Sequence, residues 1–230
     1  MKTLRNALTV TLLVAFGFSA SAQLAVGARG GATLAKTMGS GYIQNYTGEL
    51  NPIVSGNAAV FLKVPIAGGL SFRPEIGYVQ NGAGFTANEL MDLVGVNLPL
   101  SGSLRQRMTY VQAPLLLQYE FGGKEAPVKP YIVLGPTFSY LVDGKIVSRA
   151  DLLVFRSRPL RTNIGLGVFN RFDIGAAAGA GLNFDLGTVQ MMLEARYDRG
   201  FTPVYDAPVV RVPVHNQAVS VMAGFAIPLR

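Results

Sequence analysis

Two runs of alternating apolar and polar positions, at residues 109–121 and 130–141, mark the centre of the chain. Side chains of an extended strand point alternately to opposite faces, so Leu115 and Leu117 share one face while Gln118 lies on the other. The segment between the two runs is rich in Gly, Pro and charged residues, as expected of a turn. We therefore predict a β-hairpin whose strands are long enough to cross a bilayer.

The same alternation recurs in six further runs, which predicts eight strands in total. These runs lie at about residues 23–35, 57–65, 70–81, 172–184, 189–198 and 219–229. Short turns near residues 67–69, 122–129 and 185–187 alternate with long connections at 36–56, 82–106, 143–170 and 201–216. This alternation of short and long connections is typical of an antiparallel up-and-down barrel in the bacterial outer membrane, with short turns in the periplasm and long loops outside.

Charge placement favours a membrane barrel over a soluble one. No Asp, Glu, Lys or Arg occupies an outward position in these runs, and the charged residues on the opposite face are Arg29, Lys63, Arg73, Glu75, Glu120, Asp173, Glu194, Arg196 and Asp198. A soluble barrel would place its charges outside and its apolar residues inside. The reverse arrangement predicts lipid as the external solvent and an all-β transmembrane fold.

The inward charges predict a filled lumen. Four cations face five anions, and eight strands enclose a space that their own side chains normally fill. We expect a paired cluster centred on Arg29, Arg73, Glu75, Glu194 and Arg196. Unpaired charges in a poorly hydrated lumen would be costly, so pairing is expected to close the barrel to ions.

The short turns also predict the register of neighbouring strands. A three-residue turn after the second run sets Phe61 beside Glu75. If Asn183 lies beside Gln190 across the turn at 185–187, Gly179 lies next to Glu194 and Ala177 next to Arg196, and small residues make room for long charged ones.

Residues 1–22 are predicted to be a signal peptide, which leaves residues 23–230 as one outer-membrane β-barrel domain. Lys2 and Arg5 precede an uncharged apolar segment, and Ala-Ser-Ala at residues 20–22 has the small residues of a cleavage site. The alternative is a membrane anchor, but the apolar segment is shorter than the roughly 20 residues that a spanning helix needs. The chain contains no Cys, so it has neither a lipid-anchoring nor a disulfide-forming residue.

The central hairpin resembles a known family. Residues 110–116, reading Tyr-x-x-x-Pro-Leu-Leu, and residues 130–136, reading Pro-Tyr-x-x-x-Gly-Pro, are similar to the porin-like outer-membrane β-barrel family, which includes PorT-type proteins. The resemblance implies an eight-stranded barrel in a Gram-negative outer membrane. For PorT-type members it implies an accessory role in a secretion or gliding complex, although most members of the family have no assigned activity.

Two of the predicted loops have features of their own. The connection at 82–106 contains a capping-box spacing from Thr86 to Glu89, which predicts either a short surface helix or an irregular loop. The connection at 143–170 is a predicted basic extracellular loop carrying Lys145, Arg149, Arg156, Arg158 and Arg161. Such a loop either binds the phosphates of lipopolysaccharide or is simply solvated.

The sequence predicts no catalytic, cofactor-binding or metal-binding residues. His215 is the only His, and no spacing joins it to Ser220 and an acidic residue as a hydrolase would require. Export and the absence of a folded basic face argue against nucleic-acid binding. The predicted function is a monomeric, non-enzymatic barrel that contacts outer-membrane lipid and an unknown protein partner. The alternatives are a small porin-like channel and a lipid-modifying enzyme.

Overall fold

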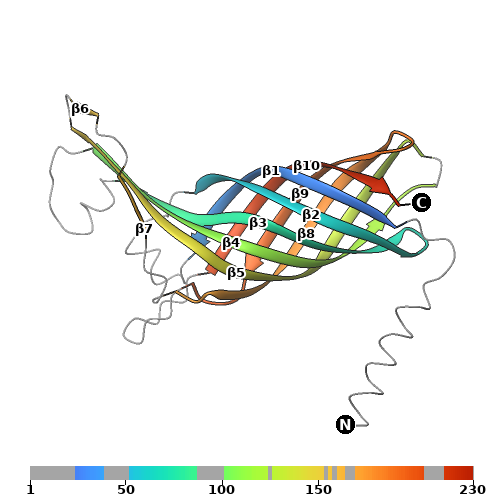
Figure 1. The fold of residues 1–230 in the computed structure, drawn as a ribbon, viewed down its shortest axis with the longest axis horizontal. Helices are drawn as coiled ribbons and strands as arrows, with labels where there is room; N and C mark the ends of the chain where they lie inside the picture. Colours follow the sequence, from blue (N-terminus) through green and yellow to red (C-terminus); the bar gives the residue numbers. More distant parts are fainter. Residues whose placement is uncertain are drawn as a thin grey trace, which may run out of the picture.

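The chain forms a closed antiparallel β-barrel (Figure 1), as the sequence predicts. The computed structural model describes residues 24–38, 52–86, 101–123, 126–152, 155–156, 160–163, 169–204 and 215–229. The wall strands are β1 (Ala25–Met38), β2 (Ile53–Ala67), β3 (Leu70–Thr86), β4 (Ser101–Glu120), β5 (Val128–Leu152), β8 (Phe172–Asp185), β9 (Gln190–Gly200) and β10 (His215–Pro228). Each pairs with the next, and pairing of β10 with β1 closes the ring. The predicted eight-stranded fold is therefore confirmed.

Two short strands extend the sheet beyond the ring. These are β6 (Phe155–Arg156) and β7 (Leu160–Asn163), which both pair with β5. In the part of the chain that the structure describes, no helix is long and apolar enough to cross a membrane.

Side-chain burial alternates along the wall strands, with apolar residues outside and charged residues inside, as predicted. Large apolar side chains cover the outer surface: Val54 is 67% exposed and Leu134 is 63% exposed. Charged side chains fill the inside, where Arg73 and Glu194 are each 1% exposed. Water would have to solvate the apolar wall at great cost, so this arrangement suits a barrel surrounded by hydrocarbon.

The β2–β3 turn sets the predicted register on that side of the barrel. Gly68 and Gly69 adopt positive φ angles of 54° and 90°, which glycine reaches without a steric penalty. The turn pairs Ala67 with Leu70, and a bulge between Pro65 and Ala67 shifts the ladder by one residue. Phe61 therefore lies opposite Glu75, and this register prediction is confirmed.

The predicted register between β8 and β9 is wrong by two residues. Glu194 lies opposite Gly181, and Gly179 lies opposite Arg196. The predicted register places Asn183 beside Gln190, whereas Asp185 is the residue opposite Gln190. The four-residue turn between them is held by the Leu186 N–H, which donates to the Val189 carbonyl at 3.0 Å. A shift of two residues changes the neighbours but keeps every side chain on its face, since strand side chains repeat every two residues.

The predicted loops at 82–106 and 143–170 are partly strand. β3 continues to Thr86, β4 begins at Ser101, and β5 reaches Leu152, so the β4–β5 ladder extends far beyond the shorter strands (Figure 1). This extended ladder pairs the backbone N–H and C=O groups that a loop would leave to water. Of the predicted helix, Thr86 lies in β3, and residues 87–94 lie outside the described residues.

We refer to the two ends of the barrel by their connections. The turn end carries the short connections at 68–69, 121–127 and 186–189, and the chain enters β1 there. The loop end carries the extended ladder of β3, β4 and β5 together with β6 and β7.

Candidate functional site

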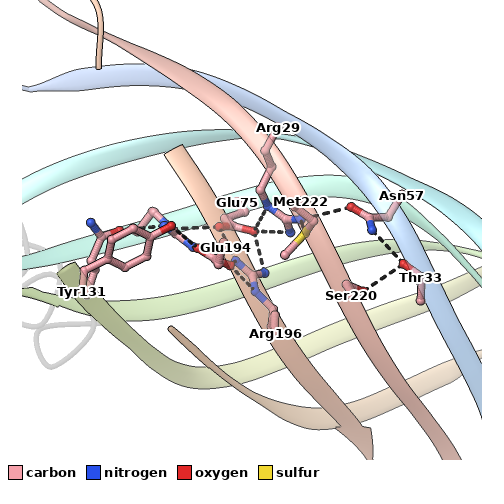
Figure 2. Close-up of polar contacts among 11 residues, drawn as sticks. Arg29, Thr33, Asn57, Glu75, Tyr131, Glu194, Arg196, Ser220 and Met222 are labelled. Carbon is pink, nitrogen blue, oxygen red and sulfur yellow. Dashed lines mark hydrogen bonds and ion pairs between the residues drawn. The ribbon is translucent and has the colours of Figure 1, made fainter. Parts of the chain in front are cut away.

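A cluster of five charged side chains lies in the middle of the lumen (Figure 2). Arg29 comes from β1, Arg73 and Glu75 from β3, and Glu194 and Arg196 from β9. All five are buried inside the barrel. We call this group the central cluster.

Glu75 is the meeting point of the three arginines. Arg29 donates from Nη2 to Glu75 Oε2 at 2.6 Å, and Arg73 Nε forms an ion pair with Glu75 Oε1 at 2.9 Å. Arg196 approaches with both terminal nitrogens, each 3.0 Å from a carboxylate oxygen of Glu75. One carboxylate thus ties β3 to β1 and β9 across the lumen.

Glu194 forms the second junction. It accepts a hydrogen bond from Arg73 Nη2 at 2.6 Å and another from Arg196 Nε at 2.7 Å. The Tyr131 hydroxyl on β5 donates to the same carboxylate at 2.9 Å. Because Arg73 and Arg196 also bind Glu75, the cluster is a continuous network and not a set of separate pairs.

Neutral groups accept further hydrogen bonds from Arg29 and Arg73. Arg29 Nη1 donates to Asn57 Oδ1 at 3.2 Å and contacts the Met222 sulfur. Arg73 Nη1 donates to Gln118 Oε1 at 2.7 Å. These polar partners matter because a buried charge is tolerated only when it is both paired and hydrogen-bonded.

Two aromatic rings enclose the Arg73 guanidinium. Its Cζ atom lies 5.5 Å from the centre of the Phe61 ring and 5.7 Å from the centre of the Tyr131 ring, within the range of cation–π attraction. Each ring lies over a glycine of the neighbouring strand. A Cβ added to Gly27 would be 2.3 Å from Phe61 Cζ, and one added to Gly181 would be 2.5 Å from Tyr131 Cζ. The two glycines therefore make room for the rings that hold Arg73.

Lys63 and Glu120 form a separate group nearer the turn end. Lys63 Nζ lies 2.5 Å from Glu120 Oε1, and the same oxygen accepts from Gln118 Nε2 at 2.9 Å and from Asn183 Nδ2. The two charged side chains are 12% and 15% exposed, so water reaches them more readily than it reaches the central cluster.

Asp173 and Asp198 lie toward the loop end. Asp173 accepts hydrogen bonds from the Thr202 N–H at 3.2 Å and from Asn216 Nδ2 at 3.4 Å. Asp198 lines a small cavity with Arg29 and Arg196, and its buried Oδ1 has no hydrogen-bond partner in the described part of the chain. Neither aspartate forms an ion pair with a described cation. The predicted nine-residue group is thus divided into a central cluster, one pair and two separate carboxylates.

The space left inside the wall is small. One cavity, beside Arg29 and Asp198, has a volume of about 10 Å³, and a second, beside Asp173 and Asp198, has about 20 Å³. A single water molecule needs about 10–15 Å³, so each cavity has room for roughly one water. The described side chains leave little space for a solute at this depth.

The family follows from the fold and from a comparison with known proteins. A family model described as the outer membrane protein beta-barrel domain matches residues 18–206. The chain belongs to this outer-membrane β-barrel family. Its location is therefore the bacterial outer membrane, as the charge pattern predicts.

Solved structures of outer-membrane barrels are similar to this barrel. Neisserial surface protein A shares 17% identity at a TM-score of 0.45, with 91% of this chain and 100% of that chain covered. A major outer membrane protein from Thermus thermophilus shares 11% identity at 0.47, with coverages of 91% and 100%. OprG from Pseudomonas aeruginosa shares 12% identity at 0.45, with coverages of 91% and 97%. No curated protein matches the chain in sequence.

The outer-membrane barrel does not bring His215 and Ser220 together. His215 is the first residue of β10, and Ser220 lies five positions later, so the two side chains point to opposite faces of the strand. Ser220 is buried inside the barrel, where its hydroxyl lies 2.9 Å from Thr33 Oγ1. Among the described residues, no group of three or more His, Asp or Glu side chains is arranged to hold a metal ion.

The prediction of a basic loop needs correction, because its described residues lie on strands. Lys145 and Arg149 belong to β5, Arg156 to β6 and Arg161 to β7, while Arg158 lies outside the described residues. Pairing of β5 with β6 and β7 organises this segment, and the sequence lacks the clear alternation that would have predicted it. Lys145 is half exposed and pairs with Asp143 at 2.7 Å.

Sequence reasoning missed the neutral members of the site. The sequence predicts Tyr131, Gln118 and Asn57 only as wall residues and Phe61 only as the neighbour of Glu75, although each contacts an arginine or carboxylate of the central cluster. Their inward position in the alternating pattern is the only signal that the sequence offers. Alternation assigns a side chain to one face of the strand, but it does not say which inward side chains meet across the lumen.

Proposed function

We propose that this protein is a non-enzymatic outer-membrane barrel, closed to ions, that uses its loop end to contact partners at the cell surface. The observation that supports closure is the central cluster, in which two carboxylates and three guanidinium groups join β1, β3 and β9 across the lumen. An ion could pass only by separating these pairs, and each exposed charge would then have to find other partners.

Planar-bilayer recording tests closure. The refolded wild-type barrel should show no steady conductance. A Glu75→Gln/Glu194→Gln variant removes both negative charges from the central cluster and should allow intermittent conductance, because three arginines would then repel one another. Lys129→Gln, which changes a cation at the turn end, is the matched control and should stay closed. Steady, salt-dependent conductance of the wild type, unchanged by Glu194→Ala, would support the small porin-like channel instead.

The proposed orientation places the turn end in the periplasm and the loop end outside. It is supported by the connection lengths, since outer-membrane barrels have short periplasmic turns and long external segments. In this orientation exposed Lys145 faces the cell exterior, and the strands that carry Arg149, Arg156 and Arg161 lie on the same side. An acidic surface of a protein partner would suit this positive charge.

Cross-linking tests the surface partner. A photoreactive residue in place of exposed Lys145 should capture a partner from detergent-solubilised outer membranes. The same residue at Thr188, in the β8–β9 turn, is the control for the other end. Capture only at Thr188 would refute a loop-end partner.

The ring has no open edge within the membrane, so we expect the barrel itself to be a monomer.

The resemblance to PorT-type proteins supports a second proposal for the turn end, an accessory contact with a secretion or gliding complex. The observation that favours it is a cavity of about 380 Å³ at this mouth, lined by residues that include Lys63, Lys129 and Asp185. Such a cavity could receive an acidic side chain or chain terminus. Specific cross-links from Thr188 to a periplasmic protein, lost in a Lys63→Gln/Lys129→Gln variant, would support this role.

The non-enzymatic part of the proposal is supported by the separation of His215 from Ser220 on opposite faces of β10. We expect His215→Ala cells to keep the lipid A and phospholipid composition of wild-type cells. A changed lipid profile that wild-type protein restores would favour the lipid-modifying enzyme.

A further inference from the structure

A row of polar side chains crosses the outer wall at the loop end. Lys36 on β1 pairs with Gln217 on β10, and Gln217 pairs with Arg199 on β9. The Cα atoms of directly opposite residues in an antiparallel ladder are about 5 Å apart, so the Cα atoms of Lys36 and Arg199 lie about 10 Å apart on either side of Gln217. We call these three residues the polar row.

The polar row follows immediately after an apolar row. Two positions closer to the turn end, Leu34, Val219 and Tyr197 pair in the same way across β1, β10 and β9. Their side chains are 47%, 49% and 41% exposed on the outer wall. Because strand side chains alternate, residues two positions apart share a face, and the polar row therefore points outward as well. Arg199 is exposed, which agrees with this orientation.

This change from apolar to charged positions marks the boundary of the hydrocarbon. A Lys or Arg on the lipid-facing wall is unfavourable at the bilayer centre and is tolerated near the interface. Tyr197 lies at the boundary, where aromatic side chains of membrane barrels commonly gather. The charges of the polar row are thus at the depth of the lipid headgroups.

The turn end has no matching outward cations among the described residues. Its outward positions there are apolar, as with Phe121, Met191 and Ile227, which are 44–50% exposed. The cations near this end are largely covered and paired with carboxylates, Lys63 with Glu120 and Lys129 with Asp185. Positive charge on the outer wall is therefore found only at the loop end of the described barrel, which indicates an anionic headgroup in that leaflet.

We infer that the polar row binds a phosphate group of lipopolysaccharide in the outer leaflet. Arg199 supplies a planar guanidinium that can bind two phosphate oxygens at once, while Lys36 adds a point charge and Gln217 an amide donor. The acyl chains of the same lipid would pack on Leu34, Val219 and Tyr197. This inference rests on the orientation proposed above, and it adds a lipid site on the wall to the contacts proposed for β5, β6 and β7.

The test measures binding of purified bisphosphorylated lipid A, and of the same lipid after dephosphorylation, to the refolded full chain in detergent. The wild type should bind the phosphorylated lipid at least tenfold more tightly than the dephosphorylated one. Lys36→Gln/Arg199→Gln should lose this preference. Arg199→Lys, which keeps the charge without the guanidinium, should retain part of it. Every variant is first checked for heat-dependent migration on a gel, so that only folded barrels are compared.

Two control variants separate this site from the other proposals. Lys129→Gln changes a cation at the turn end, and Lys145→Gln changes an exposed cation on β5, so both should bind lipid A within about twofold of the wild type. If Lys145→Gln alone weakened binding, the phosphate site would lie on the extended ladder and the polar row would be rejected. Equal binding of phosphorylated and dephosphorylated lipid would also reject it, as would full displacement of lipid A by millimolar inorganic phosphate. None of these outcomes depends on whether the lumen conducts ions.

Discussion

At the scale of single residues, the barrel interior is held by charges that share partners. Glu75 contacts three arginines, and Glu194 contacts two arginines and the Tyr131 hydroxyl. Removing one carboxylate leaves an excess of buried positive charge, whereas removing a cation and an anion together leaves a better balance. The network therefore makes each member costly to lose alone.

We expect Glu194→Ala to destabilise the barrel by about 3–5 kcal/mol, because it leaves Arg73 and Arg196 without one of their two carboxylate partners. Equilibrium unfolding in urea, with the folded fraction measured by gel migration, gives the free energy. Asp143→Ala is the control, since Asp143 and Lys145 are 41% and 50% exposed and such a pair contributes about 0–1 kcal/mol. Similar losses for the two variants would contradict a poorly hydrated lumen.

A double-mutant cycle gives a second prediction at this scale. Arg73→Met and Glu194→Met together should destabilise the barrel by less than the sum of the two single changes, with a coupling of about 0.5–3 kcal/mol. Arg73 also binds Glu75 and Gln118, so the coupling should be smaller than the full cost of either single substitution. Additive effects would mean that the pair at 2.6 Å contributes nothing to stability.

At the scale of the strands, small residues decide how closely the inward side chains pack. Gly181 on β8 lies opposite Tyr131 on β5 and opposite Glu194 on β9, so the ring that contacts Arg73 occupies space that a side chain at residue 181 would need. An added Cβ would also be 2.5 Å from the Leu193 carbonyl oxygen, which belongs to the β9 backbone and cannot turn aside.

Gly181→Ala should therefore destabilise the barrel by about 1–3 kcal/mol through overpacking. Gly123→Ala is the matched control, because a Cβ there meets no atom within 4 Å and the change should stay within about 0.5 kcal/mol. The same urea unfolding measures both variants. A harmless Gly181→Ala would show that Tyr131 can move away without loss, and that its bond to Glu194 is unimportant for stability.

At the scale of the whole molecule, the apolar outer wall is bordered by different charged residues at the two ends of the barrel. The turn end has paired, covered lysines, and the loop end has outward cations and an extended ladder of strands. Such asymmetry suits a membrane whose two leaflets differ, and it gives the barrel one preferred orientation.

Cysteine labelling on intact cells tests that orientation. A cysteine at exposed Lys145 should react with a membrane-impermeant reagent, whereas one at Gly123 or Thr188 should react only after the outer membrane is opened. The chain has no native Cys, so the background is low. Labelling of Gly123→Cys and protection of Lys145→Cys would reverse the orientation and move the proposed lipid site to the inner leaflet.

The sequence by itself determined the barrel, its strand number and the face of almost every wall residue. This was possible because strand side chains alternate with a period of two. The apolar face and the polar face of each strand can therefore be assigned without knowing which strand lies beside it. The same parity placed Arg29, Arg73, Glu75, Glu194 and Arg196 in the lumen.

Only the tertiary structure decided which inward side chains meet. The β8–β9 register depends on which residue of β8 pairs with Gln190 at the turn, and the contacts of Glu75 with Arg29 and Arg196 join strands far apart in the sequence. The closure of the ring brings these strands together, and strand tilt sets the height at which each side chain enters the lumen. Alternation is local and can be read along the chain, whereas contacts across the lumen depend on turn length, tilt and closure together.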